Sequence, residues 1–374
     1  MTPMNVLLVS GGSGGHLTPA MALAQHLCSG AGAENRCFMI STRRPVDRIL
    51  SAERGGVLEW ETVGLQPFTP VWRWFFPFFV ARQMRAAAQI RSIIGRTRPD
   101  VVVGFGGYLS AVGVVAAWGA DIPVVIHEQN VLPGQANRWL ARLADTVAVS
   151  FPETARALPK GVAVETTGNP IRLRAGALTA EQARAELGLD ADRPVLLVMG
   201  GSQGSRAINR AVVGMWRRMT PRAREEVQLL HLAGMQGVAE VEPMYRQLGI
   251  QAKVLPFLHR MDLGLAAATL AISRAGATAI AEMVEMGVPS ILIPYPHAGG
   301  HQRANARWMR ESGGAIVIEE SDLSPERLQR ETEQLLFNPE RLERLRRALP
   351  GRSDGSAAQR LGELVKRIGK TKIK

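Results

Sequence analysis

A histidine follows a turn of five small residues that itself follows a short apolar run. Residues 6–9 are apolar, Gly11 to Gly15 form the turn with Ser13 as its hydroxyl residue, and His16 comes next. Backbone N–H groups at the start of a helix favour an anion, and the helix dipole adds to this preference. An imidazole there can take a proton from a hydroxyl or donate a hydrogen bond to a phosphate. The stretch predicts an anion site with His16 as a general base; a capping or packing histidine is the alternative.

A second group of polar residues, His127 to Asn130, follows an apolar run at residues 124–126. Polar side chains at the carboxyl end of a parallel strand fit a substrate site better than a core. Glu128 is therefore the second candidate for a general base. His127 and Glu128 are adjacent, so in an extended chain they point to opposite sides and are not expected to act as one pair. Hydrogen bonds to neighbouring loops are the alternative role for both.

Another glycine turn, Gly104 to Tyr108, follows the apolar residues 101–103. Two glycine turns at the ends of strands of one sheet would make an anion cradle broad enough for a diphosphate. The alternative is that the glycines only allow tight connections. A dinucleotide fingerprint is disfavoured. Leu17 stands where the third glycine belongs, and the next predicted strand ends in Thr42 and two arginines rather than in an acid for a ribose.

The first strand and its turn recur in the second half of the chain. Val195 lies 189 positions after Val6, and its apolar run leads into the turn Gly200 to Gly204. The repeat suggests two domains that each open with the same strand, turn and helix.

A nucleotide site is predicted after the apolar residues 270–273. Gly276 and its alanine neighbours are small enough for a ligand to approach the start of the helix that follows. Glu282 lies about one and a half turns into this helix and could accept hydrogen bonds from both hydroxyls of a ribose. A solvated helix glutamate is the alternative.

Short apolar runs alternate with helical patterns along the whole chain, which predicts parallel sheets with crossover helices. We expect an α/β protein of the GT-B type, with two Rossmann-like domains that face a cleft. The expected domains are residues 1–167, 168–350 and a basic C-terminal helix at 351–374 that could pack back on the first domain. The expected strands are residues 6–10, 37–41, 101–104, 124–127 and 146–149 in the first half, and 195–199, 227–232, 253–255, 270–273 and 290–294 in the second.

Composition limits the possible partners and compartments. The 374 residues fit two domains, and the net charge of +12 favours an anionic partner. The two cysteines, Cys28 and Cys37, are too few for a disulfide framework, so a reducing compartment is expected. No signal-peptide pattern precedes the first strand.

A membrane-binding segment is predicted between residues 71 and 98, which hold six arginines and no acid. Aromatic rings beside an unopposed basic helix are typical of an interfacial anchor on anionic lipid. Nucleic-acid binding is disfavoured, because the rings are not interleaved with the charges as stacking platforms would be. A buried loop with a solvated helix is the structural alternative. The expected contacts are Trp72, Trp74, Phe75, Phe76, Phe78, Phe79, Arg82 and Arg85.

Seven motifs occur in an order and spacing that resemble the MurG family of bacterial glycosyltransferases. They are GGSGGH, GFGGY, HEQN, GNPIR, GGSQGS, RAGATAIAE and HQRANA, and they extend from Asn5 to about Ala306. The resemblance implies a GT-B enzyme that transfers N-acetylglucosamine, with inversion, from UDP-N-acetylglucosamine to the C4 hydroxyl of N-acetylmuramoyl-pentapeptide carried on undecaprenyl diphosphate. This step belongs to peptidoglycan synthesis, and hence to cell-wall biogenesis, cell shape and cell division. A related transferase that acts on diacylglycerol is the alternative.

The resemblance also implies roles for individual residues. The acceptor diphosphate would lie against Gly14, Gly15, Gly106, Gly107 and Tyr108, with His16 or Glu128 as the base. The residues implied in binding the donor are Ser13, Gly14, Gly15, Asn130, Arg172, Ser202, Leu258, Ala277, Thr278, Ala279, Ile280, Ala281, Glu282, His301 and Gln302.

Neither a cofactor nor a metal is expected, and the resemblance implies a peripheral protein on the cytoplasmic face of the inner membrane. One departure from the family pattern stands out: the loop between Pro296 and His301 reads HAGG, whereas members often carry an acid just before the glutamine. Contacts of such an acid to the sugar are therefore not expected here.

Overall fold

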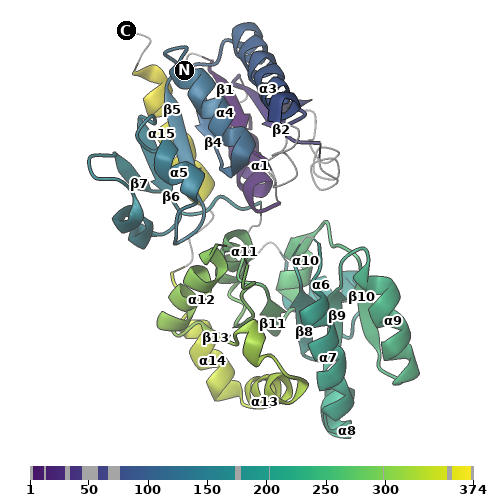
Figure 1. Ribbon diagram of the computed structural model, residues 1–374. Helices are drawn as coiled ribbons and strands as arrows, with labels where there is room; N and C mark the ends of the chain where they lie inside the picture. Colours follow the sequence, from purple (N-terminus) through teal and green to yellow (C-terminus); the bar gives the residue numbers. More distant parts are fainter. Residues whose placement is uncertain are drawn as a thin grey trace. The chain divides into compact units, whose positions relative to one another are not determined.

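The computed structural model in Figure 1 divides the chain into two compact units. Unit 1 comprises Met1–Arg172 and Ser356–Lys374, and unit 2 comprises Leu173–Gly355. The structure describes residues 3–11, 14–29, 34–43, 58–65, 76–172, 178–201, 203–297, 299–351 and 356–371.

Unit 1 is built on a seven-stranded sheet in the order β3-β2-β1-β4-β5-β6-β7, and every pair in it is parallel. The strands are β1 (Asn5–Val9), β2 (Arg36–Ser41), β3 (Leu58–Thr62), β4 (Val101–Gly104), β5 (Val124–Glu128), β6 (Thr146–Val149) and β7 (Val164–Thr166). The helices are α1 (Gly14–Leu27), α3 (Phe76–Thr97), α4 (Gly107–Trp118), α5 (Gln135–Leu140), the 3-10 helix η3 (Pro152–Ala157) and α15 (Ala357–Lys370).

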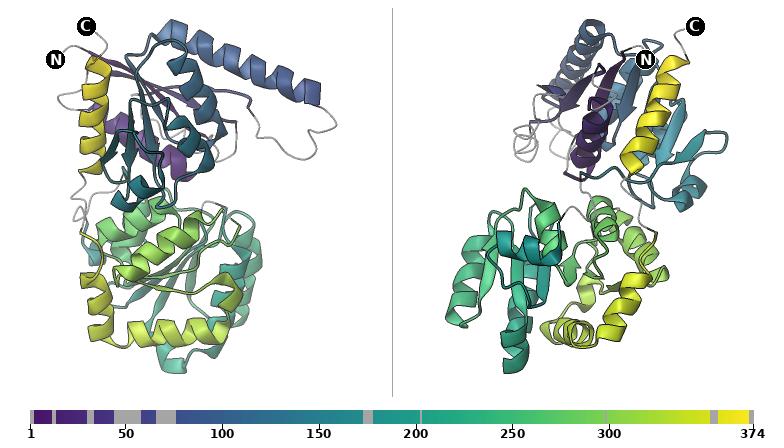
Figure 2. Two further views of the ribbon diagram at one scale, coloured as in Figure 1. Left: turned by 60° about the vertical axis from the view of Figure 1, so that its left-hand side comes forward. Right: turned by 180° about the vertical axis from the view of Figure 1, so that it is seen from behind.

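Residues 6–9 of β1 are all apolar because helices cover both faces of the sheet. Leu7 and Val9 lie in a buried cluster with α3 and α4, whereas Val6 and Leu8 lie in another cluster with α1 and α15. Figures 1 and 2 show these two helix layers from opposite sides. The alternation of side chains along a strand sends successive residues into the two layers.

Unit 2 repeats this arrangement with a six-stranded parallel sheet in the order β10-β9-β8-β11-β12-β13. Its strands are β8 (Val195–Met199), β9 (Gln228–Leu232), β10 (Ala252–Leu255), β11 (Leu270–Ser273), β12 (Ser290–Leu292) and β13 (Ala315–Val317). Its helices are α6 (Ala180–Glu186), α7 (Arg206–Arg218), α8 (Pro221–Glu226), α9 (Gly237–Gln247), α10 (Met261–Ala267), α11 (Ala277–Met286), α12 (His301–Glu311), η4 (Glu320–Asp322), α13 (Pro325–Leu336) and α14 (Pro339–Arg347).

In each sheet, the direction in which successive strands are added reverses at one point. In unit 1 the chain runs outward from β1 to β3 and then returns to start again at β4 beside β1; in unit 2 the same reversal separates β8 from β11. Ligands of open α/β sheets bind at the carboxyl ends of the strands that flank such a reversal. The turns after β1 and β4, and after β8 and β11, are therefore the places for a site.

The predicted α/β class and the two parallel-sheet domains are confirmed, but the strand list needs corrections. Strands β3, β7 and β13 were not predicted from the sequence; they are edge strands with mixed burial. The expected strand at residues 290–294 ends earlier, at Leu292. Pro294 lacks the N–H that a longer ladder would use.

The C-terminal helix α15 belongs to unit 1. Leu361, Leu364 and Val365 are buried in the cluster that also contains α1, and Figure 2 shows the two helices on the same side of the sheet. Arg360 Nε donates to the carbonyl of Thr167 at 3.0 Å. Among the helices that the structure describes, none has the length and apolar character needed to cross a membrane.

Candidate active site

The glycine turns after β1 and β4 contact each other through His16. A Cβ on Gly106 would lie 3.3 Å from His16 Nε2, and a Cβ on Gly107 would lie 2.3 Å from the carbonyl oxygen of Gly11. Gly107 also has φ +81°, which disfavours any side chain there. The two turns can approach this closely only because Gly107 has no side chain.

The proton position on His16 follows from its hydrogen bond. His16 Nδ1 lies 3.2 Å from the carbonyl oxygen of Gly11. A carbonyl oxygen can only accept a hydrogen bond. Nδ1 therefore carries the proton in the neutral ring, and Nε2, beside the Gly106 turn, is the basic nitrogen. The structure thus brings together the predicted base and both predicted turns of unit 1.

His127 is fully buried and is held as a neutral ring. Its Nε2–H donates to the carbonyl of Gly168 at 3.0 Å, and its Nδ1 accepts from Gln129 Nε2 at 3.0 Å. Burial is the main reason that the pKa of His127 falls to about 4. This histidine is a structural member of the polar segment rather than a base.

Both carboxylate oxygens of Glu128 are engaged in organising the loop after β5. Oε1 accepts from the backbone N–H and the side-chain amide of Asn130, at 2.9 and 3.1 Å. Oε2 accepts from the N–H of Gly134 at 3.0 Å and from Asn137 Nδ2 at 2.8 Å. Glu128 is only 1% exposed. Four donors on a buried carboxylate satisfy its oxygens and fix its position.

The other predicted residues of unit 1 lie around these turns or at its boundary. Gly14 and Gly15 begin α1, and Tyr108 lies in the first turn of α4 with 42% of its surface exposed. Ser13 lies outside the described residues. Arg172 is exposed and is the last residue of the first segment of unit 1.

In unit 2 the glycine turn after β8 contacts the loop after β9. Gly204 has φ +75°, and a Cβ there would lie 2.3 Å from the carbonyl oxygen of Ala233. Ser205 caps α7, since its Oγ accepts from the N–H of Ile208 at 3.4 Å. Ser202 lies outside the described residues. The start of α7 is positioned to attract an anion at the carboxyl end of β8.

The residues predicted to line the nucleotide form the first six positions of α11. The side chains of Ala277 and Ile280 are buried, so they can offer only backbone to a ligand. Thr278, Ala279, Ala281 and Glu282 are partly exposed. Desolvation raises the pKa of Glu282 to about 7.

Three further predicted donor residues lie in loops or at a helix start. Gln302 is in the first turn of α12, and its Oε1 accepts from the N–H of Tyr295 at 2.9 Å. His301 begins the same helix, and its ring lies close to Gly299. Leu258 packs its side chain against Gly264 of α10.

Arg274 is a site residue that was not singled out from the sequence, although it opens the motif RAGATAIAE. Its guanidinium is almost buried, donates to Ser205 Oγ at 2.8 Å and to the carbonyl of Ile293 at 3.1 Å, and forms an ion pair with Glu320. Its Cζ lies 5.3 Å from the ring centre of Tyr295. Arg274 therefore ties the end of β11, after which the nucleotide site is predicted, to the cap of α7.

Comparison with known proteins decides the family. Residues 6–149 match the glycosyltransferase family 28 N-terminal domain, and residues 195–361 match the C-terminal domain of that family. The chain belongs to glycosyltransferase family 28.

Relatives and solved structures agree with this assignment. A protein of Clavibacter michiganensis is 38% identical over 96% of this chain and 95% of its own length, and one of Nocardioides is 38% identical over 98% of each. Both are named UDP-N-acetylglucosamine–N-acetylmuramyl-(pentapeptide) pyrophosphoryl-undecaprenol N-acetylglucosamine transferase. The crystal structure of Acinetobacter baumannii MurG is 27% identical, covers 98% of this chain and 100% of its own, and has a TM-score of 0.70. CalG4, at 16% identity and a TM-score of 0.69, shows the same fold.

For this family 28 member, the predicted membrane segment is only partly described. Trp72, Trp74 and Phe75 lie outside the described residues, and Phe76, Phe78 and Phe79 are described only as the backbone of α3. Arg82 and Arg85 are exposed on α3, as the prediction requires.

The helix layer of α3, α4 and α5 carries exposed apolar residues that were not predicted from the sequence. Met84 is 68% exposed, Trp118 56% and Trp139 75%, and Arg142 lies over the Trp139 ring with Cζ 6.0 Å from its centre. These residues are spread over three helices, so only the fold shows that they share one layer (Figure 1). In the sequence these positions are far apart, and nothing there indicates that they are exposed on the same side of the unit.

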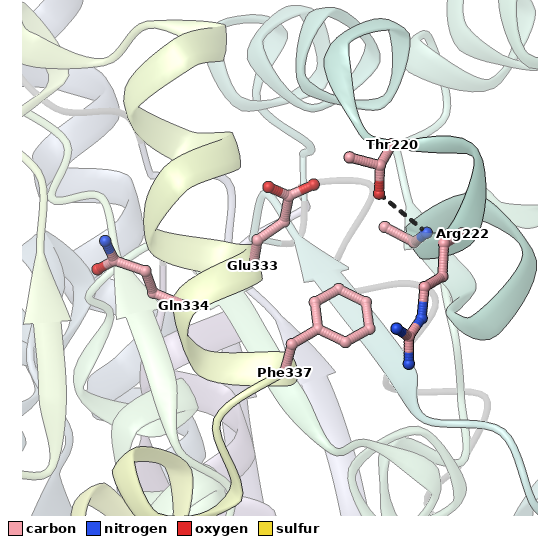
Figure 3. A pocket seen from close by; sticks show the side chains of 6 residues that line it. Thr220, Arg222, Glu333, Gln334 and Phe337 are labelled. Atoms are coloured by element: carbon pink, nitrogen blue, oxygen red, sulfur yellow. Dashed lines mark hydrogen bonds between the residues drawn. The ribbon is translucent and has the colours of Figure 1, made fainter.

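A cavity of about 520 Å³ in unit 2 is separate from the predicted donor site. It opens between α8 and α13 and is lined by Glu333 and Phe337 on one side and Thr220 and Arg222 on the other (Figure 3). Helix α8 leads directly into the start of β9, so this cavity lies toward the amino ends of the strands. Ligands of this fold class bind at the carboxyl ends.

Proposed function

We propose that this family 28 enzyme transfers N-acetylglucosamine from UDP-N-acetylglucosamine to the C4 hydroxyl of N-acetylmuramoyl-pentapeptide on undecaprenyl diphosphate. The observation that carries the proposal is the contact of His16 with both glycine turns at the strand reversal of unit 1, in a chain whose relatives bear the name of this transferase. A basic nitrogen beside two anion-binding turns suits an acceptor that carries a hydroxyl and a diphosphate.

The proposed role of unit 1 is to hold the acceptor and remove its proton. The N–H groups of Gly14, Gly15 and the Gly106–Gly107 turn bind the acceptor diphosphate, with Tyr108 at its rim. His16 Nε2 takes the hydroxyl proton as the C4 oxygen forms its bond to the anomeric carbon. Glu128 is the weaker candidate for the base, because its four hydrogen bonds commit it to the loop that carries Asn130.

The proposed role of unit 2 is to bind the donor and to stabilise the departing UDP. The starts of α7 and α11 direct N–H groups and dipole toward the diphosphate, and Arg274 holds the two starts in register. As the bond from the anomeric carbon to the diphosphate oxygen breaks, negative charge grows on that oxygen, so fixed donors lower the barrier. Glu282 accepts from the ribose, Leu258 presents its backbone to the uracil, and Gln302 with His301 holds the sugar.

Two residues are proposed donor contacts from other parts of the chain. Arg172 provides positive charge for the leaving diphosphate, and Asn130 reaches the donor sugar.

Ser13 and Ser202, one in each glycine turn of the sequence, are proposed to contribute hydroxyl groups to donor binding.

A diacylglycerol acceptor is the alternative, and the comparisons favour the peptidoglycan intermediate. The relatives at 35–38% identity are named for the muramyl-pentapeptide acceptor, over 91–98% of this chain. Diacylglycerol has no diphosphate, so it would also leave the cradle at His16 without a ligand.

The experiment is acceptor-dependent release of UDP. Purified enzyme with UDP-N-acetylglucosamine should release UDP only when the lipid-linked muramoyl-pentapeptide is added, and diacylglycerol should not replace it. Release with diacylglycerol alone would move the proposal to the alternative acceptor. No release with either would remove the transferase proposal.

We also propose that the enzyme binds the cytoplasmic face of the cell membrane through α3 and the neighbouring helices. The exposed Arg82 and Arg85 of α3 provide charge for anionic lipid, and the exposed side chains of Met84, Trp118 and Trp139 provide apolar contact. Binding to vesicles that contain anionic lipid should exceed binding to neutral vesicles and should weaken as salt rises. Arg82→Glu with Arg85→Glu should lower it. Equal binding to neutral vesicles would contradict the proposed electrostatic contribution of the arginines to membrane binding.

A further inference from the structure

The only two cysteines of the sequence contact each other in the fold. Cys28 directly follows α1, and Cys37 is the second residue of β2. Their Sγ atoms are 2.7 Å apart. The contact joins the residue after α1 to β2, the strand beside β1, and neither cysteine has a part in the proposed transfer of sugar.

The two thiols differ in their environment. Cys37 is 2% exposed and belongs to the buried cluster around Leu27 and Met39, whereas Cys28 is half-buried and can be reached by a small reagent. The hydrogen bond with Cys37 lowers the pKa of the Cys28 thiol, and the same contact together with burial raises the pKa of Cys37. Cys28 is therefore the reactive thiol and Cys37 its buried neighbour.

We propose that Cys28 and Cys37 are a reversible oxidation site, in which a hydroperoxide attacks at Cys28 and the pair then closes to an intramolecular disulfide. The distance between the sulfur atoms requires only a small movement to reach the ~2.05 Å of an S–S bond.

The chemistry balances in two steps. The Cys28 thiolate attacks one oxygen of the hydroperoxide, which breaks the O–O bond, gives Cys28 sulfenic acid and releases hydroxide, or alkoxide from an alkyl hydroperoxide. Cys37 sulfur then attacks the Cys28 sulfur, the S–O bond breaks, and water leaves with the Cys37 proton. Two thiols are oxidised, one peroxide is reduced, and a dithiol reductant restores the pair.

The buried Cys37 thiol, 2.7 Å away, would protect Cys28 from irreversible oxidation. A sulfenic acid without a neighbouring thiol proceeds to sulfinic and sulfonic acids, which are not reversible by ordinary thiols. Formation of the disulfide with Cys37 stops the oxidation of Cys28 at a stage that a thiol can reverse. The pair lies at the end of α1 opposite to His16, almost the whole length of the helix away. Oxidation is thus expected to leave the proposed base in place.

The test is the intact mass of the full-length protein after treatment with hydrogen peroxide. Formation of the disulfide should remove about 2 Da from the wild-type protein and make it unreactive to N-ethylmaleimide. Dithiothreitol should restore both the original mass and the reactivity. Peptide mapping should find Cys28 joined to Cys37 within one chain. Retention of a reactive Cys28 thiol, a gain of oxygen at Cys28 without this link, or a disulfide between two copies would overturn the proposal.

Single variants separate the roles of the two sulfurs. Cys37→Ala should gain about 32 or 48 Da at Cys28 under the same treatment, because the sulfenic acid has no partner. In Cys28→Ser, the peptide that contains Cys37 should neither lose hydrogen nor gain oxygen at comparable peroxide, because Cys37 is buried. Faster oxidation of Cys37 than of Cys28 would contradict the assignment. Circular dichroism of each variant before treatment shows that the comparison is made on folded protein.

Discussion

At the scale of single residues, the position of one proton gives His16 its proposed role. The carbonyl of Gly11 can accept only from Nδ1–H, which leaves Nε2 basic beside the second turn. His16→Ala should lower kcat by about 10²–10⁴-fold, the usual contribution of a general base. The KM for UDP-N-acetylglucosamine should change little, because the donor is proposed to bind unit 2. Steady-state kinetics in both substrates would measure this, and a variant with normal kcat but lost donor affinity would contradict the role.

The absence of a side chain at Gly107 should matter for the same site. Gly107→Ala places a Cβ 2.3 Å from the Gly11 oxygen at φ +81°. The backbone conformation alone should then lower the free energy of unfolding by roughly 1 kcal/mol or more. The matched control is Gly95→Ala in the exposed part of α3, where a Cβ meets nothing within 4 Å. That change should stabilise by up to about 1 kcal/mol. Urea unfolding would compare them; equal effects would contradict the close approach of the turns.

Glu282 leads to a pH-dependent prediction for donor binding. With its pKa raised to about 7, Glu282 is largely neutral below this value and ionised above it. The carboxylate is a stronger acceptor for the ribose hydroxyls than the neutral acid, so the donor KM should fall as the pH rises through about 7. Glu282→Gln should raise the donor KM and remove this pH dependence, with the acceptor KM unchanged. An equal rise of both KM values would show that Glu282 is not at the nucleotide.

At the scale of elements, a chain of buried hydrogen bonds links α9 to α7 across β9. Tyr245 OH donates to His231 Nδ1 at 2.8 Å, and His231 Nε2–H donates to Asn209 Oδ1 at 3.0 Å. Asn209 Nδ2 then donates to the carbonyl of Ala233 at 3.0 Å, beside Gly204. Burial raises the pKa of Tyr245 far above its ordinary value, so the hydroxyl keeps its proton. The network fixes the loop that supports the glycine turn of unit 2.

Removing one donor from this network tests its contribution. Tyr245→Phe leaves His231 Nδ1 buried without a donor, so the free energy of unfolding should fall by about 1–3 kcal/mol. Tyr108→Phe is the control for stability, because Tyr108 is exposed on α4 and should change unfolding little. If Tyr245→Phe were as stable as the control, water or another group would have to satisfy the histidine.

The sequence predicted the central strands better than the edges, for a physical reason. A strand covered by helices on both sides is apolar over most of its length, so β1, β4, β8 and β11 were visible as apolar runs. Edge strands β3 and β7 carry charged and partly exposed residues that interrupt any apolar run, whereas β13 is the short apolar run Ala-Ile-Val, whose signal was missed.

The candidate site could likewise be predicted only in part from the sequence. Glycine turns at strand ends are local features, so the anion sites could be predicted. The hydrogen bonds that hold Glu128 and Arg274 come from residues up to 69 positions away, and these partners are known only from the fold.

At the scale of the whole molecule, each unit contains one buried neutral histidine, which makes the protein sensitive to acid. Burial lowers the pKa of His127 in unit 1 to about 4 and that of His231 in unit 2 to about 3, from about 6.5 in an unfolded chain. The unfolded state therefore binds the proton first as the pH falls. The stabilisation is complete above about pH 6.5 and is lost progressively below it, by about 2 kcal/mol for each histidine between pH 7.5 and pH 5.

Urea unfolding of the full chain at these two pH values measures the effect, with separate transitions assigned to the units where they occur. His127→Gln should reduce the acid sensitivity of unit 1 alone, and His231→Gln that of unit 2 alone, because each removes one titrating group. His259→Gln is the matched control at an exposed histidine of unit 2, and an equal loss of acid sensitivity there would show that the effect is not specific to His231. If His231→Gln kept the full acid sensitivity of unit 2, other groups would be responsible, and the buried histidine of each sheet would not set the lower pH limit of this enzyme.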